Sequence, residues 1–447
     1  MSMKINLSLI AIIAGFGAFC AQAQTTDQEL SQNISLATSN YALYPEPTQK
    51  LSKAPAGYKA FYMSHYGRHG SRYHYDAKDY ANLYNIFAKA DSAKVLTPLG
   101  KSVLERFKQL NDRAAKKAGD LTQKGVAQHQ GIANRMYKNF PEIFKGDAYV
   151  EAMASTSVRC VVSMASALEE LRALNPKMRI HQEASKSTVH FLDPYNFESA
   201  NEYANTKEWQ AESAKMYKDI NPYTMMKKLF TDSAWVDKFM DVGTFYGKFY
   251  EIQSSMQNLD DFDFDFRDVW TDADLIARWK AQNAWWYSVL GNCPLTGNKG
   301  ITFAKPLLKN FLDEADRVLA MDSSADKNAK KNQPKATLRY GHDTGLLPLA
   351  GLMGLDVAKA NTSDIENLHK VWTDFRIVPM AANVQWIFYK SAKKGAPILV
   401  KVLYNENEAT LPVACGITDE AKAKKECPMA PYYRWEDVRS TYLKIAE

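Results

Sequence analysis

The chain has 447 residues, of which 46% are hydrophobic, 12% aromatic and 24% charged. These fractions are typical of a folded globular protein and exclude a disordered or fibrous chain. The 56 basic and 50 acidic residues leave a formal charge of +6 spread along the sequence, which does not predict a nucleic-acid-binding protein. The length exceeds what one hydrophobic core usually serves, so we expect two subdomains or one domain with a large insertion.

The first 23 residues have the three parts of a secretory signal peptide. Lys4 supplies the positive start, the apolar run 7–19 is too short to cross a bilayer as a helix, and Ala21-Gln22-Ala23 is a small-x-small cleavage site. We therefore expect cleavage after Ala23 and export of the mature chain, either to a periplasm or out of the cell. No later run is long and apolar enough to predict a membrane span.

Removal of the signal peptide leaves an even number of cysteines, namely Cys160, Cys293, Cys415 and Cys427. In an oxidising compartment such a set permits disulfides, and four cysteines allow three pairings. The pair Cys415–Cys427 is favoured because it would close a short loop near the C-terminus. Cys160 lies among apolar residues and is expected to be a free buried thiol.

Short apolar or alternating runs predict five β-strands, at residues 59–64, 149–154, 336–340, 384–389 and 398–404. A glycine-bearing turn is expected at 65–67, directly after the first strand. Helical periodicity predicts helices at 121–137 and 158–171, and helical patterns dominate residues 192–319.

Strands near both ends of the chain and a helical middle predict one α/β domain interrupted by a mainly helical insertion. We assign residues 24–190 and 331–447 to the α/β domain and residues 191–330 to the insertion. In α/β sheets ligands bind past the carboxyl ends of the strands. Three of the predicted strand ends carry residues suited to phosphoryl chemistry.

The pentapeptide Arg68-His69-Gly70-Ser71-Arg72 directly follows the first predicted strand. Its arginines can bind the nonbridging oxygens of a phosphoryl group with fork-shaped donors, and an imidazole nitrogen can attack the phosphorus. Gly70 allows the backbone to come close to an anion. The pattern predicts a phosphohistidine site with His69 as the nucleophile, and the alternative is a basic surface turn.

Two further strand ends carry matching chemistry. Asp343 can protonate the leaving oxygen of a phosphoester and then activate water, while the preceding His342 can donate to the phosphoryl oxygens. Arg159 follows a Ser155-Thr156 turn, which is expected to cap a helix, and would add a third guanidinium. A surface ion pair is the alternative interpretation of Arg159.

These residues resemble the histidine acid phosphatases, the branch of the histidine phosphatase superfamily that contains phytases and multiple inositol polyphosphate phosphatases. Four segments match the family pattern in its order, namely residues 61–73, 121–137, 155–168 and 338–355. The match at residues 68–73 is closest to the inositol polyphosphate phosphatases. That group typically has His-Ala-Glu where this chain has His342-Asp343-Thr344, the form typical of phytases and acid phosphatases, so the regiospecificity stays open.

The resemblance implies a fold and a set of roles. The fold is a phosphoglycerate-mutase-like α/β sheet domain with an inserted, mainly helical domain. His69 is the nucleophile, Asp343 is the proton donor, and the phosphoryl group is held by Arg68, Arg72, Arg159 and His342. No cofactor or metal ion is implied, because the arginines take the place that Mg²⁺ fills in other phosphoryl-transfer enzymes.

The sequence therefore predicts an exported phosphomonoesterase that acts on inositol polyphosphates such as phytate. A broader acid phosphatase that acts on sugar phosphates or other small monoesters is the alternative. A non-catalytic phosphate-binding protein on the same scaffold is disfavoured, because both His69 and Asp343 are present.

Two other groups of residues resemble functional sites. Three nearby histidines suggest zinc, but the arginines beside His69 would repel a cation; the group is His65, His69 and His74. Three tryptophans at helical spacing are expected in a helix core rather than in a substrate cleft; they are Trp279, Trp285 and Trp286.

Overall fold

The computed structural model of the chain describes residues 26–195 and 197–447. The predicted signal peptide lies outside the described residues. None of the helices in the described ranges combines the length and the hydropathy that crossing a membrane requires.

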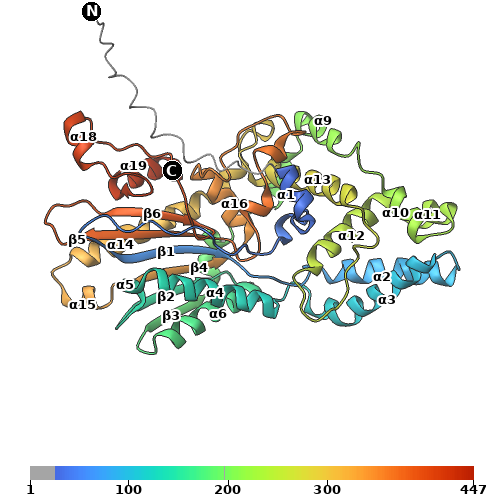
Figure 1. The fold of residues 1–447 in the computed structure, drawn as a ribbon, viewed down its shortest axis with the longest axis horizontal. Helices are drawn as coiled ribbons and strands as arrows, with labels where there is room; N and C mark the ends of the chain where they lie inside the picture. The colour runs from blue at the N-terminus through green and yellow to red at the C-terminus, as the bar shows by residue number, and fades with distance from the viewer. Residues whose placement is uncertain (1–25, 196) are drawn as a thin grey trace, which may run out of the picture.

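The chain forms a mixed β-sheet at one end of the molecule (Figure 1), with strand order β3-β2-β4-β1-β5-β6-β7 and β8 beside β6. The strands β3, β2, β4 and β1 are parallel to one another, and β5 and β6 continue the sheet in antiparallel fashion. The bounds are β1 (Tyr58–Arg68), β2 (Tyr149–Ala154), β3 (Arg179–Ala184), β4 (Ala336–Gly341), β5 (Asn383–Ser391), β6 (Leu399–Tyr404), β7 (Asn407–Glu408) and β8 (Tyr433–Arg434).

All five predicted strands are present, and the α/β fold class is confirmed. The turn predicted at residues 65–67 is wrong, because β1 continues to Arg68 and pairs with β4 on one side and β5 on the other. Gly67 belongs to the strand because it pairs with Tyr340 on one side and Asn383 on the other, and a Cβ at this position would lie 2.9 Å from the His65 ring. The strand β3 was not predicted, since its polar, largely exposed sequence RIHQEA lacks the apolar pattern of a buried strand.

Helices cover both faces of the sheet. One face packs against α4 (Gln123–Asn139), α5 (Pro141–Phe144) and α6 (Val158–Leu174), and the other against α14 (Lys305–Ser323), α16 (Asp343–Leu352) and α19 (Trp435–Ala446) (Figure 1). Side chains alternate along β1, so the strand contributes to the hydrophobic core on each face of the sheet. Met63 packs on the face covered by α4, α5 and α6, and both Tyr62 and Tyr66 pack on the face covered by α14, α16 and α19.

A second, helical region lies beside the sheet (Figure 1) and has its own aromatic core. Phe87 of α2 (Ala77–Ser92), Phe107 of α3 (Pro98–Gln109) and Phe249 of α12 (Val242–Met256) pack together there with ring centroids 5.0–6.4 Å apart. The region thus combines the predicted insertion with α2 and α3, which precede β2 in the sequence. The helix α14, although within residues 191–330, packs on the sheet instead. The three-part domain division stays a prediction.

The remaining helices complete the helical region and the connections. Their bounds are α1 (Thr26–Gln32), α2 (Ala77–Ser92), α3 (Pro98–Gln109), α7 (Val189–Leu192), α8 (Phe197–Ala204), α9 (Lys207–Met216), α10 (Pro222–Leu229), α11 (Ser233–Phe239), α12 (Val242–Met256), α13 (Asp272–Leu290), α15 (Lys327–Lys331), α17 (Asp374–Ile377) and α18 (Glu420–Glu426).

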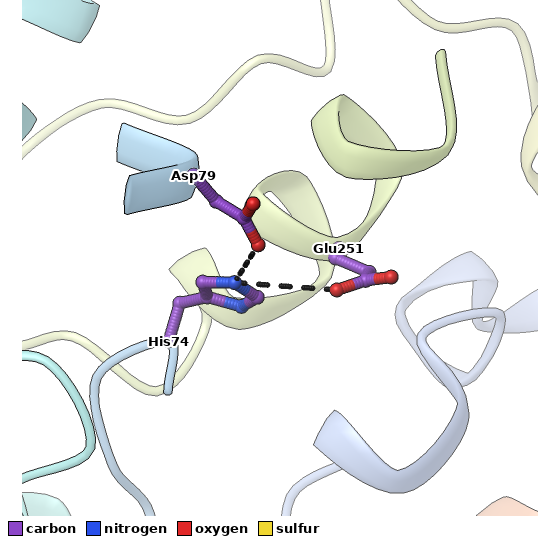
Figure 2. A group of neighbouring side chains, drawn as sticks. All are labelled: His74, Asp79 and Glu251. Carbon is purple, nitrogen blue, oxygen red and sulfur yellow. Dashed lines mark hydrogen bonds and ion pairs between the residues drawn. The ribbon is translucent and has the colours of Figure 1, made fainter. Parts of the chain in front are cut away.

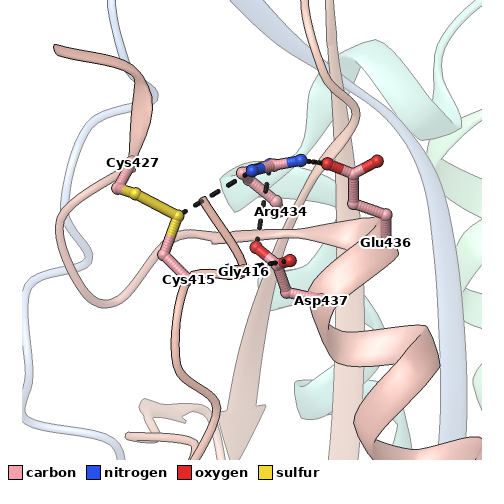
Figure 3. The surroundings of a disulfide bond; sticks show 6 residues. All are labelled: Cys415, Gly416, Cys427, Arg434, Glu436 and Asp437. Carbon is pink, nitrogen blue, oxygen red and sulfur yellow. Dashed lines mark hydrogen bonds and ion pairs between the residues drawn. A yellow bond between two sulfur atoms is a disulfide. The ribbon is translucent and has the colours of Figure 1, made fainter. Parts of the chain in front are cut away.

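A disulfide joins Cys415 and Cys427 across α18, as predicted (Figure 3). Arg434 extends beside the Cys415 sulfur, and Asp437 accepts a hydrogen bond of 3.1 Å from the backbone N–H that follows Cys415. The disulfide and these contacts tie the segment around α18 to the start of α19. Cys160 and Cys293 are free and buried, which confirms the prediction for Cys160.

Candidate active site

Three parallel strand ends meet at one edge of the sheet. In the register of the sheet, Arg68 of β1 lies opposite Gly341 of β4, and Ala154 of β2 lies opposite Tyr340 of β4. The residues that follow these strands therefore come together although they are distant in sequence. This is the convergence that the sequence predicted for the three motifs.

The turn after β1 is held against the first turn of α4 by two glycines. A Cβ on Gly70 would lie 2.6 Å from the Gly125 carbonyl oxygen, and a Cβ on Gly125 would lie 2.3 Å from the Ser71 carbonyl oxygen. Gln128 of α4 accepts a hydrogen bond of 2.8 Å from the Ser71 N–H. Only glycine at both positions lets the helix approach this closely, so the turn is rigidly placed.

His69 is 1% exposed, and its ring is both oriented and neutral. Its Nδ1 lies 3.0 Å from the Gly70 carbonyl oxygen, which can only accept, so Nδ1 carries the proton and Nε2 keeps a lone pair. Burial, reinforced by Arg159, Arg68 and Arg72, holds the pKa of His69 well below its usual range. A neutral, buried imidazole with a free Nε2 is suited to nucleophilic attack.

Asp343 begins α16 and pairs with Arg68, whose Nη2 lies 2.8 Å from a carboxylate oxygen of Asp343. Asn40 donates to the same oxygen at 2.7 Å. Burial raises the pKa of Asp343, but Arg68, the bond from Asn40 and Arg72 outweigh it and lower the pKa to about 2. Asp343 is therefore a carboxylate.

Arg68 is fully buried behind Asp343. Its Nη1 donates to the carbonyl oxygens of Asn40 and Val378, both at 2.6 Å. The cavity described below is lined by Asp343 and not by Arg68. Arg68 thus holds Asp343 in this conformation, and its predicted contact with a phosphoryl group stays a prediction.

His342 and Arg159 contact each other at the ends of β4 and β2. Arg159 Nη2 lies 3.3 Å from His342 Nδ1, and because a guanidinium can only donate, Nδ1 accepts. Nε2 then carries the proton and faces Ser155 Oγ at 2.9 Å and an Asp193 oxygen at 3.4 Å. Burial lowers the pKa of His342 to about 4, although Asp193 opposes this, so the ring is neutral.

These strand-end residues open into a cavity of about 630 Å³ between the sheet edge and the helical region. Aromatic side chains and three arginines form much of its lining, together with carboxylates. The charged lining residues are Arg72, Arg159, Asp193, Glu251, Arg278 and Asp343. The structure thus brings five predicted site residues to one cavity, with Arg68 directly behind it; the five are His69, Arg72, Arg159, His342 and Asp343.

Some residues at this site were not predicted. Asn40 and Asp193 lie in segments without a motif, so nothing in the sequence marks them. Ser155 was expected to cap α6, but the cap position is Ser157, which makes no side-chain cap bond, and Ser155 binds His342 instead. Tyr66 lies in the fully buried part of β1, and the sequence does not show that its hydroxyl reaches the His-Asp motif.

Tyr66 fixes the backbone of the His-Asp motif. Its hydroxyl accepts a hydrogen bond of 2.9 Å from the His342 N–H and donates one of 2.8 Å to the Leu192 carbonyl. A Cβ on Gly341 or Gly345 would lie 2.2–2.3 Å from this hydroxyl oxygen, so both glycines make room for it.

The helix-core prediction for the tryptophans of α13 is only partly correct. Trp279 is fully buried in the aromatic core of the helical region. Trp286 is buried as well, yet both Trp285 and Trp286 line the cavity. They lie at the end of α13 where its packing changes from the helical core to the cavity, a change that spacing along one helix does not reveal.

A sequence model of the histidine phosphatase superfamily (branch 2) matches residues 67–405. The chain belongs to this family. It is a phosphoric monoester hydrolase, as the resemblance implied. None of the curated protein sequences matches the chain significantly.

Solved structures share the fold of this histidine phosphatase. The multiple inositol polyphosphate phosphatase of Bifidobacterium longum, in complex with inositol hexasulfate, superposes with a TM-score of 0.71 at 19% identity and covers 91% of this chain and 97% of its own. The phytase from D. castellii superposes with a TM-score of 0.63 at 13% identity and covers 96% of this chain and 90% of its own. At these identities the likeness concerns the fold.

Proposed function

We propose that this histidine phosphatase hydrolyses inositol polyphosphates through a phosphohistidine on His69, with Asp343 as the proton donor. The observation that carries the proposal is the arrangement of a neutral His69, two cavity-lining arginines and Asp343 around one cavity. The fold shared with the inositol polyphosphate phosphatase and the phytase supports the choice of substrate.

In the first step, Nε2 of His69 attacks phosphorus and the bond to the bridging oxygen breaks. Asp343 gives its proton to that oxygen, which leaves as an alcohol. In the second step, Asp343 takes a proton from water, the water oxygen attacks phosphorus, and the phosphorus–nitrogen bond breaks. Inorganic phosphate is released and His69 is neutral again. Arg72 and Arg159 stabilise the negative charge of the phosphoryl oxygens throughout.

Asp343 must be protonated to act as the proton donor, although Arg68, Asn40 and Arg72 together hold its pKa at about 2. A bound phosphoryl dianion adds negative charge beside the carboxylate and attracts the same arginines, so it raises the pKa of Asp343. Activity is therefore expected to be greatest on the acid side of neutrality.

The cavity also bears on substrate size. Its volume of about 630 Å³ leaves room for a ring that carries several phosphates, and Arg278 on α13 lies opposite the sheet edge. Arg278 has no carboxylate partner among the described ion pairs; its guanidinium lies over the Tyr250 ring and bonds Gln282. It is placed to bind a second phosphate of the same substrate.

A second candidate function rests on the two other carboxylates of the cavity. Asp193 and Glu251 face the same space, and they would repel a highly anionic substrate. This observation favours smaller monoesters such as sugar phosphates, which leave that part of the cavity unoccupied.

Phosphate release from phytate, p-nitrophenyl phosphate and glucose 1-phosphate, each in excess EDTA, tests these proposals. Preferential release from phytate that is lost in His69→Ala supports the inositol polyphosphate assignment. A preference for small monoesters supports the second candidate. A His69→Ala protein as active as the parent excludes the phosphohistidine mechanism, and binding without turnover reopens the binding-protein interpretation.

Export is part of the proposal. The Cys415–Cys427 disulfide supports it, because disulfides persist in oxidising compartments. Expression of the full chain followed by N-terminal sequencing of the exported protein tests it, and a first residue of Gln24 is expected.

A further inference from the structure

A compact polar cluster lies directly behind Arg72. His74, Asp79 and Glu251 come within reach of one another (Figure 2), and they are a group in the described residues that could hold a metal ion. The ammonium of Lys248, however, lies 3.1 Å from an Asp79 oxygen and 3.5 Å from a Glu251 oxygen. This positive charge already occupies the acceptors that a cation would use, so the cluster is better explained as a hydrogen-bonded structure.

The cluster connects to the cavity through Tyr41. His74 Nε2 lies 2.7 Å from Asp79 Oδ2, and His74 Nδ1 lies 2.9 Å from the Tyr41 hydroxyl. That hydroxyl accepts a hydrogen bond of 3.3 Å from Nη1 of Arg72, whose guanidinium also lies over the Tyr41 ring. Tyr41 and Arg72 line the cavity, while His74 is fully buried behind them.

The donors and acceptors along this connection fix the direction of each hydrogen bond. Burial raises the pKa of Asp79, but the bonds from His74 and Lys248 outweigh it, so the group is a carboxylate that can only accept. His74 Nε2 therefore carries a proton. Burial also raises the pKa of Tyr41, which keeps its proton. Because the guanidinium of Arg72 can only donate, the Tyr41 hydroxyl gives its own proton to His74 Nδ1, and its oxygen lone pairs face Arg72.

We propose that Tyr41, His74 and Asp79 are positioning residues that fix the guanidinium of Arg72 for phosphate binding. Asp79 sets the tautomer of His74, and His74 orients the Tyr41 hydroxyl. The hydroxyl oxygen then holds Nη1 of Arg72 together with the Tyr73 carbonyl oxygen, which accepts from the same nitrogen at 3.0 Å. A guanidinium that is already oriented loses less conformational freedom when it binds an anion. The inference rests on the proposed function, because it takes Arg72 to be a ligand of the phosphoryl group.

The main test is Tyr41→Phe, which removes the hydroxyl but keeps the ring that lies under Arg72. Inorganic phosphate is the probe, through its inhibition constant and through direct calorimetric binding. We expect phosphate to bind about tenfold more weakly, because one hydrogen bond to a charged group is lost. Tyr73→Phe is the matched control, since its hydroxyl in the same turn bonds Asp261 and lies outside the cavity lining. The control should change phosphate binding by less than about twofold.

A double-mutant cycle separates positioning from general stabilisation. His74→Leu alone should weaken phosphate binding about as much as Tyr41→Phe, but it should add less than about twofold in the Tyr41→Phe background. The inference would be overturned if the loss of phosphate affinity in the double variant equals the product of the losses in the two single variants. His74→Asn, whose amide oxygen can accept from Tyr41, should keep binding within about threefold of the parent, and a larger loss would overturn the inference even if His74→Leu does not fold.

The outcomes distinguish this inference from the proposed function. A parent protein that neither turns over phosphomonoesters nor binds phosphate refutes the proposed function itself. An active parent whose Tyr41→Phe variant binds phosphate with unchanged affinity refutes only the positioning role.

Discussion

The two sides of the cavity are built in different ways. The sheet side consists of His69, Arg72, His342 and Asp343, all no more than 7% exposed, with Arg159 beside them. The helical side presents Tyr250, Glu251, Arg278 and Trp285 from α12 and α13, and most of these side chains are half-buried. The sheet side is held by strand register and by close backbone contacts at glycines where a Cβ would clash, whereas the helical side is defined by side chains alone.

This difference indicates a division of labour. Reacting groups need placement to a fraction of an ångström, which paired backbones provide. Substrate selection needs surfaces that can change without disturbing that placement, and side chains on two helices provide them. Substitutions on the sheet side should therefore affect turnover of every substrate, and substitutions on the helical side should affect the choice between substrates.

The largest expected effect is that of His69→Ala. Loss of the nucleophile should lower kcat by at least about 10⁴-fold on all substrates, including those with good leaving groups. Steady-state kinetics with phytate and p-nitrophenyl phosphate check this. If phosphate still inhibits the residual activity of the variant, or if calorimetry still detects phosphate binding, the variant is folded. A loss of kcat on only one of the two substrates would contradict the expectation that the sheet side serves every substrate.

Asp343→Asn should lower kcat about 10²–10⁴-fold on alkyl phosphates, because an alkoxide leaves poorly without a proton. The loss should be smaller on p-nitrophenyl phosphate, whose leaving group needs little protonation, but it should still be measurable, because Asp343 also takes the proton from water in the second step for every substrate. Parallel kinetics on the two substrates measure the ratio. Equal losses on both would show that Asp343 acts in another way.

The Arg68–Asp343 pair should also make the sheet side sensitive to acid. The folded pKa of Asp343 is depressed to about 2, so the pair stabilises the protein above the ordinary pKa of an aspartate and loses this effect as pH falls through about 2. The contribution is about 2 kcal/mol at neutral pH. Urea unfolding between pH 2 and pH 6 should show a steeper loss of stability in the parent than in Asp343→Asn. If the unfolding free energies of the parent and of Asp343→Asn change with pH in the same way, the lowered pKa of Asp343 is wrong.

The smallest effect, and the sharpest test of the helical side, is that of Arg278→Ala. It should raise KM for phytate about tenfold, equivalent to about 1.4 kcal/mol, and change KM for p-nitrophenyl phosphate less than about twofold. Lys280→Ala, on the same helix but outside the cavity lining, is the matched control and should leave both values unchanged. An equal effect of Arg278→Ala on the two substrates would mean that Arg278 acts on the reacting phosphate.

The sheet side could be predicted from the sequence because its motifs directly follow apolar strands. A buried strand ends at the edge of the sheet, so a motif that directly follows one has a predictable position. Residues 68–72 and 341–344 therefore indicate both where they lie and which chemistry they support. Asn40, Asp193 and Tyr41 could not be predicted, since each is a single polar residue that reaches the site through long-range packing. Ser155 was predicted to cap a helix, because a serine after a strand is typical of a cap, and its contact with His342 depends on the register of β2 and β4.

The helical side was harder to predict for a related reason. The periodicity of α13 indicates a helix but not the point at which its buried face passes from one core to the cavity, so Trp285 was expected elsewhere. Likewise, no local pattern shows that α2 and α3 pack with α12. Such contacts depend on how whole helices meet, and only the folded chain determines them.

The position of β1 has a consequence for the order in which the enzyme forms. The strand is synthesised early, but its partners are Ala336–Gly341 on one side and Asn383–Ser391 on the other. A ribosome-bound or truncated chain that ends before residue 391 therefore carries His69 on a strand that lacks at least one neighbour. Pairing across such a long loop is slow relative to local helix formation. Activity should therefore appear late in folding, after the helical region has already acquired its structure.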